Sequence, residues 1–304
     1  MANLTMITGF LLMSFSNTWE LQVLHIMLFL LIYLVALMGN MLIFILISVD
    51  VHLHTPMYFF LKNLSFLDLC FITVTVPKSI ANSLSHSYSI SYLGCATQVF
   101  LGILFAASEV FILTAMFYDR YVAICQPLHY EMIMKYESCM KMAVASWLTG
   151  GIIGLMYAVS TFSLPFCGSK EICQFFCDVN SLFRIACSKT YVAVDVTIAI
   201  GSVLVILCCI FIAVSYSQIF SAVIKIPTTE GQSKAFSTCL PHLIILTVFV
   251  TTGAMAYLKP PLDSDTIVDL LLSVLYTMVP PTLNPVIYSL RNKDMKPSMK
   301  KLIA

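Results

Sequence analysis

Residues 116–125 read Met-Phe-Tyr-Asp-Arg-Tyr-Val-Ala-Ile-Cys, and they end an apolar run that begins near residue 94. The run is longer than the about 17 to 25 residues that a helix needs to cross the hydrocarbon core of a bilayer. It closes on Asp119 and Arg120, and an arginine keeps its proton inside proteins. Because ionisable side chains in or beside a membrane segment are costly and usually partnered, this pair is the first candidate for a functional switch.

The composition of the whole chain also indicates a lipid solvent. Of the 304 residues, 60% are hydrophobic and 10% are charged, and the mean hydropathy is +0.94. Soluble domains carry about 25% charged residues, so this chain has too little polar surface to cover a globule. A net charge of +1 gives no reason to expect a nucleic-acid partner.

Seven apolar stretches of membrane-spanning length follow one another along the chain. Since the alternating pattern of a β-barrel is absent, we expect an all-α membrane protein, a single domain over residues 1–304 built as a seven-helix bundle. The second stretch contains Pro77, and prolines also interrupt the seventh; membrane helices tolerate them when neighbours satisfy the freed carbonyls. The expected spans are about residues 23–48, 57–81, 94–125, 140–162, 192–224, 235–258 and 267–289.

The lysines and arginines predict the orientation of the bundle. With the N-terminus outside, eleven of the sixteen lie at cytoplasmic ends, and the extracellular parts are residues 1–22 and a long loop at 163–191. Asn3 then begins an extracellular Asn-Leu-Thr sequon, either glycosylated or unused. Residues 290–304 form a cytoplasmic tail, either a short amphipathic helix or a frayed basic segment. The eleven are Lys62, Arg120, Lys135, Lys141, Lys225, Lys234, Arg291, Lys293, Lys296, Lys300 and Lys301.

Five cysteines fall on the extracellular side in this topology. An oxidising compartment favours disulfides among them, and a bond from Cys95 to the long loop would tie the loop over the mouth of the bundle. Because five is odd, at least one thiol is left over, and spacing alone does not say which. The five are Cys95, Cys167, Cys173, Cys177 and Cys187.

Asp68 and Glu109 are the two acids deepest in apolar sequence, and both are expected to face the bundle interior. One reading is that they share a cation such as sodium with polar neighbours like Asn40, Ser108 and Asn284. The other is that one or both stay protonated and bond to each other. Apart from this sodium ion we expect no cofactor.

The sequence carries no enzyme motif: a His-Glu-x-x-His pair, a glycine-rich phosphate loop and a nucleophile elbow are all missing. Cys239 and His242 lie three residues apart, but two ligands do not make a zinc site, so no metal site is expected. A secondary transporter is the alternative from another functional class. It is disfavoured because the chain shows no inverted repeat and no paired broken helices.

Six motifs in sequence order resemble those of odorant receptors, a family of rhodopsin-like G-protein-coupled receptors. The resemblance covers nearly the whole chain. It implies a multi-pass plasma-membrane protein that binds a small, weakly polar volatile and activates a stimulatory, olfactory-type heterotrimeric G protein, raising cyclic AMP, with membrane lipid around it. The motifs are Gly39-Asn40, Leu-His-Thr-Pro-Met-Tyr-Phe-Phe-Leu at 53–61, residues 116–125, Ser215-Tyr216, Lys-Ala-Phe-Ser-Thr-Cys at 234–239, and residues 284–292.

The resemblance also implies roles for single residues. Cys95 would pair with Cys177 and Cys167 with Cys187, leaving Cys173 as the odd thiol. Asp119 would hold Arg120 at rest and release it to the G protein on activation; the switch set is Asp119, Arg120, Tyr121, Tyr216, Asn284, Pro285 and Tyr288. The ligand pocket, small and apolar with a few hydroxyls and no charge, would be lined by Gly102, Ile103, Ala106, Ala107, Thr197, Ile200, Gly201, Leu204, Gly253, Ala254 and Tyr257.

The chain departs from the family pattern at one position that bears on this pocket. Val250 stands where these receptors usually carry a tyrosine. The change removes a ring and a hydroxyl from the part of the sixth span that would link the pocket to the switch.

Overall fold

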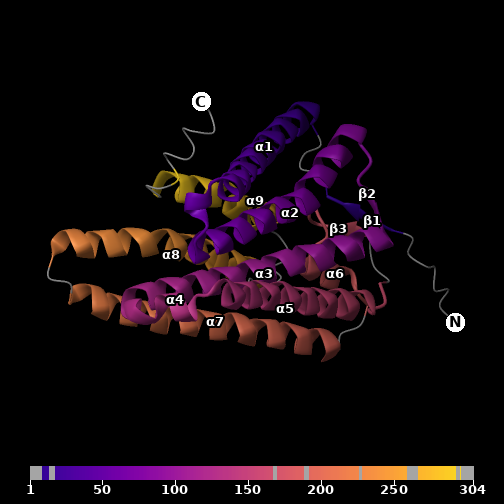
Figure 1. Cartoon of the computed structure of the whole chain (residues 1–304). Coiled ribbons are helices and arrows are strands. Elements are labelled where there is room, and N and C mark those ends of the chain that lie inside the picture. Colours follow the sequence, from indigo (N-terminus) through magenta and orange to yellow (C-terminus); the bar gives the residue numbers. More distant parts are fainter. Residues whose placement is uncertain are drawn as a thin grey trace.

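The structure is a computed structural model that describes residues 9–13, 18–166, 170–187, 192–225, 228–258, 266–291 and 295. Within these ranges it describes the backbone alone at 229–231, 233–239, 241–242, 256–258, 266–270 and 289–291. Most of the described chain is helical (Figure 1). The long helices are α1 (Trp19–Val49), α2 (Pro56–Ser85), α3 (Tyr92–Cys125), α5 (Tyr136–Phe162), α7 (Val192–Ile224), α8 (Thr229–Leu258) and α9 (Thr266–Arg291).

Each apolar stretch predicted from the sequence lies inside one of these helices. In the described part of the chain, α1, α2, α3, α5 and α7 are long and apolar enough to cross a membrane, and α8 has a shorter apolar segment, Leu243–Met255. The expectation of an apolar, helical membrane bundle is confirmed to that extent. The helices start earlier than predicted, α5 at Tyr136 and α8 at Thr229, because polar residues flanking an apolar stretch continue the helix.

The outer faces of the helices are apolar. Leu31 on α1, Leu148 on α5 and Leu207 on α7 are each 55% or more exposed. Exposed apolar surface on this scale is unfavourable in water and suits contact with lipid tails.

Helix α3 lies at the centre and contacts α2, α5, α7 and α8. Two glycines on α5 let its backbone approach α3 closely. A methyl group at Gly150 would meet the Ser108 hydroxyl and lie 2.7 Å from the Leu104 carbonyl oxygen, and one at Gly154 would lie 2.7 Å from the carbonyl oxygen of Phe100. Small residues spaced four apart are a common means of close helix packing in membranes.

Helix α1 packs against the proline-containing part of α9. Pro285 has no N–H, so the carbonyl of Pro281, four residues earlier, loses its usual helical partner. The side-chain amide of the buried Asn40 donates to this carbonyl at 2.8 Å. Gly39 leaves room for the contact, because a methyl group there would lie 2.8 Å from Pro285 Cβ.

A small sheet forms at the end of the bundle where α3 begins (Figure 1). Strand β1 (Gly9–Leu12) is central; it pairs antiparallel with β2 (Ser89–Ser91) and parallel with β3 (Glu171–Ile172). The short helix α6 (Val179–Ile185) packs nearby, while α4 (Tyr130–Ile133) and the 3-10 turns η1 (Val51–Leu53) and η2 (Pro127–His129) connect other helices. The sequence analysis predicted none of the strands, because runs of two to four residues carry too little periodicity.

Candidate functional site

A cavity of about 760 Å³ lies among α3, α7 and α8, beneath the segment that joins β3 to α6. Its size is in the usual range for small-molecule sites. Glycine and alanine on α3 leave the space, and aromatic rings close it at the sides. Of the residues predicted to form a pocket, those that line this cavity are Gly102, Ile103, Ala106, Ala107, Gly201, Leu204, Gly253 and Ala254.

Two other predicted pocket residues do not line the cavity. Ile200 is 39% exposed on the outer face of α7. Thr197 is buried, but its hydroxyl donates to the Ala193 carbonyl of its own helix at 2.8 Å. The apolar pattern of α7 is nearly uniform around the helix, so sequence does not reveal which side faces inward. The side chain of Tyr257 lies outside the described part of the structure.

Val250, which stands where the family pattern has a tyrosine, lines the cavity wall. Its side chain is partly buried and packs against the large apolar core that extends toward the Asp119 end of α3. A tyrosine at this position would therefore project into the cavity.

Several lining residues were missed by the sequence analysis. They come from α2, α3, α5, α6, α7, α8 and α9 as well as from the long loop, and their closeness depends on tertiary structure. Among them is a carboxylate, Asp178, which corrects the expectation of an uncharged pocket. The polar residues among those missed are Thr75, Gln98, Tyr157, Asp178, Asn180, Ser202, Cys208, Cys209 and Tyr276.

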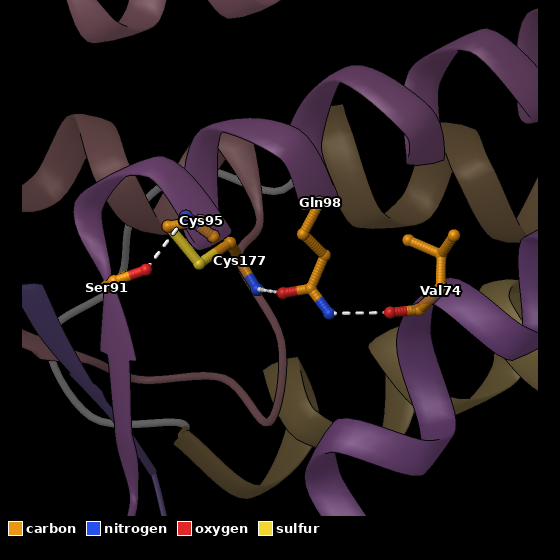
Figure 2. The surroundings of a disulfide bond; sticks show 6 residues. Val74, Ser91, Cys95, Gln98 and Cys177 are labelled. Atoms are coloured by element: carbon orange, nitrogen blue, oxygen red, sulfur yellow. Dashed lines mark hydrogen bonds between the residues drawn. A yellow bond between two sulfur atoms is a disulfide. The ribbon is translucent and has the colours of Figure 1, made fainter.

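The roof of the cavity is fixed by a disulfide and a glutamine (Figure 2). Cys95 near the start of α3 is bonded to Cys177 of the loop, the pairing that was expected. One turn further along α3, the buried Gln98 accepts a hydrogen bond from the Cys177 N–H at 2.8 Å and donates to the Val74 carbonyl of α2 at 2.8 Å. The loop, α2 and α3 are thereby joined at one point.

Asp178 follows Cys177 directly and caps the N-terminus of α6. One carboxylate oxygen accepts from the Ser181 N–H at 3.4 Å, and the other accepts from the Tyr276 hydroxyl of α9 at 3.3 Å. The side chain is buried. Burial raises the pKa of the Asp178 carboxyl, because the charged form has lost its water, and the hydrogen bonds from Ser181 and Tyr276 oppose that rise.

The remaining cysteines and the sequon are placed as follows. Cys173 is a free thiol. Cys187 is engaged in a disulfide, while its expected partner Cys167 lies outside the described residues, as does Asn3.

Asp68 of α2 and Glu109 of α3 are both fully buried and face each other across Asn284 of α9. The Asn284 amide donates to Asp68 Oδ2 at 2.8 Å and to Glu109 Oε1 at 3.3 Å. Asp68 Oδ1 has no hydrogen-bond partner in the described part of the chain. The expected neighbours Asn40 and Ser108 instead bond to backbone carbonyls, of Pro281 and of Ser146.

At the other end of α3, Asp119 is completely buried and holds Arg120. The Arg120 Nε donates to Asp119 Oδ2 at 2.9 Å, and Arg120 Nη2 bonds to the same oxygen. The second carboxylate oxygen accepts from the Tyr130 hydroxyl of α4 at 2.8 Å, a contact that sequence reasoning did not find. Burial and the nearby Asp119 charge raise the pKa of the Tyr130 phenol, which keeps it protonated as a donor.

The tyrosines of the predicted switch pack into the apolar core of the bundle. The Tyr216 ring on α7 lies 5.6 Å from the Phe117 ring, Tyr121 packs against Ile219 and Val223 with Tyr216, and Tyr288 of α9 is buried in the same core as Phe117. Helices α3, α7 and α9 therefore each contribute a tyrosine of the predicted switch to this core.

Comparison with known proteins identifies relatives along the whole chain. The family model described as "Olfactory receptor" matches residues 29–304. Human Olfactory receptor 14A2 is 59% identical over 303 residues, covering 100% of this chain and 96% of the relative. Human Olfactory receptor 14A16 is 55% identical over 303 residues, with 100% and 98% covered. Olfactory receptor 1G1 of Gorilla gorilla gorilla is 44% identical over 301 residues, with 99% and 96% covered.

Proposed function

Because this chain belongs to the olfactory receptor family, we propose that a small odorant bound in the cavity among α3, α7 and α8 controls a G-protein contact at Asp119 and Arg120. The chain is an odorant receptor, a multi-pass protein of the plasma membrane, and not an enzyme. The ligand for which the cavity is suited is a small, weakly polar volatile, since small apolar side chains form most of its wall.

The topology that we propose has seven membrane spans in one domain, with the N-terminus outside. Seven long helices support it. The sheet, α6 and the Cys95–Cys177 disulfide gather at one end of α3, which suits the oxidising outside. Asp119, Arg120 and α4 lie at the opposite end, which suits the cytoplasm (Figure 1).

The observation that carries the proposal is that cavity and switch share one helix. Ala106 lines the cavity and Arg120 lies fourteen residues later on α3, about 21 Å along the helix axis. A shift or rotation of α3 in response to a ligand would therefore move the Asp119–Arg120 pair directly. An odorant activates the receptor only if it binds more tightly to the state in which this pair is released than to the state in which the pair is intact.

The G protein that we propose is of the stimulatory, olfactory type, and the test is a cyclic AMP measurement in cells that express the chain. A panel of volatiles should raise cyclic AMP. Arg120→Ala should abolish the response with surface expression intact, because the G protein loses its cationic contact. Arg184→Ala, the same change at an exposed position of α6, serves as the control and should respond normally. A full response from Arg120→Ala would refute the role of the switch.

We also propose that Asp68 and Glu109 form a sodium site. Two buried carboxylates that share one amide donor carry uncompensated charge if both are ionised, and the unpartnered Asp68 Oδ1 offers a ligand atom. Sodium should then weaken agonist response, and Asp68→Asn should remove that sensitivity. A response that does not depend on sodium, and is the same in Asp68→Asn, leaves the alternative in which the acids are protonated.

A further inference from the structure

Among the cavity-lining residues that the structure describes, one side chain is charged, and it lies at the roof. Asp178 is buried and lines the cavity, as do Gln98, Asn180 and Tyr276 beside it. Further down, the wall is formed by residues such as Gly102, Ala106 and Val250. The cavity is therefore polar at the loop end and apolar toward the middle of the bundle.

Among the described residues, none supplies a cation to compensate the charge of Asp178. In the part of the chain that the structure describes, no lysine or arginine nitrogen lies within 4 Å of its carboxylate. Its partners are donors without charge: the Ser181 N–H at 3.4 Å, the Tyr276 hydroxyl at 3.3 Å, and the backbone N–H groups of Val179 and Asn180. A buried carboxylate that has only neutral donors gains most from a cationic one.

From this arrangement we propose that the cavity selects small apolar molecules that carry one hydrogen-bond-donating group, an amine or a hydroxyl, and that Asp178 binds this group. The proposal rests on the odorant-receptor function given above and adds the chemical class of the ligand. The donor group replaces the Tyr276 hydroxyl at Asp178 Oδ1, while the alkyl part fills the apolar end. Carboxylic acids are excluded, because their charge repels that of Asp178 in a cavity of low polarity.

The roles of Asp178 as a helix cap and as a ligand partner can be separated by one substitution. Asparagine caps a helix N-terminus about as well as aspartate does, so Asp178→Asn keeps the cap of α6 and removes the charge. Asp195→Asn removes an exposed acid in the first turn of α7, outside the cavity, and is the matched control.

The experiment measures binding without a G protein, as the rise in unfolding temperature of the purified full chain with 1-aminooctane, 1-octanol, octanal or octanoic acid. The amine and the alcohol should bind about tenfold more tightly than the aldehyde and the acid, the size of one charge-assisted hydrogen bond. Asp178→Asn should remove most of that preference and Asp195→Asn should keep it. Tyr276→Phe frees Oδ1 and should strengthen amine binding.

Equal shifts for all four molecules, including no shift with any, would overturn the proposal. So would a preference that survives Asp178→Asn or is lost in Tyr276→Phe. The two proposals fail separately: donor-selective binding without a cyclic AMP response would refute the signalling role, and a cyclic AMP response without donor preference would refute the role of Asp178.

Discussion

Single side chains in this protein carry charge into places where water is excluded, and each is held by specific partners. Asp119 is fully buried and bonds to Arg120 through one oxygen and to Tyr130 through the other. Removing one partner of a buried charge costs more than the bond itself contributed, because the charge is left without compensation. Tyr130 is thus expected to stabilise the resting state, and a single substitution tests this role.

Tyr130→Phe should raise the ligand-independent cyclic AMP signal. The ring stays, but Asp119 loses a donor worth about 1.5 to 3 kcal/mol for a charged acceptor, so the resting arrangement with a buried, ionised Asp119 becomes less stable relative to the released one. Tyr136→Phe, the same change at a tyrosine that is 68% exposed, should leave the basal signal unaltered. A lower basal signal in Tyr130→Phe would show that the tyrosine supports the active state instead.

The helices owe their mutual spacing to residues that are small or that replace missing backbone bonds. Helix α5 reaches α3 through Gly150 and Gly154, where an added methyl group would meet backbone atoms that have no room to move. Asn40 of α1 satisfies the carbonyl that Pro285 leaves without a partner in α9. The proline-rich α9 stays helical because another helix supplies the lost donor.

Gly150→Ala should lower the unfolding temperature of the purified protein. Its new methyl group would lie 2.7 Å from the Leu104 carbonyl oxygen, and overpacking of this kind costs about 1 to 3 kcal/mol. Gly151→Ala is a matched control one residue away, where the nearest atom to the added methyl is 4.0 Å distant. It should be neutral or slightly stabilising, since alanine favours a helix more than glycine does. Equal effects of the two changes would contradict the close packing of α3 and α5.

In the molecule as a whole, the cavity roof and the Asp119–Arg120 pair lie at opposite ends of one central helix, α3. At one end of α3, Cys95 and Gln98 hold the loop that roofs the cavity; at the other, Asp119 holds Arg120. The disulfide links the loop to α3 alone. Gln98 adds a link to α2, because it also donates a hydrogen bond to the Val74 carbonyl.

Gln98→Leu should weaken the odorant response while the Cys95–Cys177 disulfide still forms. The leucine leaves the Cys177 N–H without a partner in a buried place, at a cost of about 1 to 3 kcal/mol, so the roof is placed less accurately over the ligand. Non-reducing mass analysis checks the disulfide, and the cyclic AMP dose response measures the shift. Gln126→Leu, exposed at the far end of α3, controls for loss of an amide. An unshifted dose response would show that the disulfide alone places the loop.

The sequence by itself determined the helices, because an apolar run of spanning length has one stable form in lipid, whatever its neighbours are. It also indicated the Asp119–Arg120 pair, since charges beside apolar runs are conspicuous, and through the family resemblance the Cys95–Cys177 bond and most of the α3 wall of the cavity. It did not reveal the inward side of α7, where Ile200 is 39% exposed, because an evenly apolar helix shows no face.

Only the tertiary structure decided which distant residues meet. Tyr130 reaches Asp119 across eleven residues, Tyr276 reaches Asp178 across 98, and Asn284 joins two acids from α2 and α3. Such contacts depend on how helices rotate and pack against each other, and that depends on many side chains at once rather than on any local pattern. The charged roof of the cavity, and with it the chemical class of its ligand, belongs to this second kind of information.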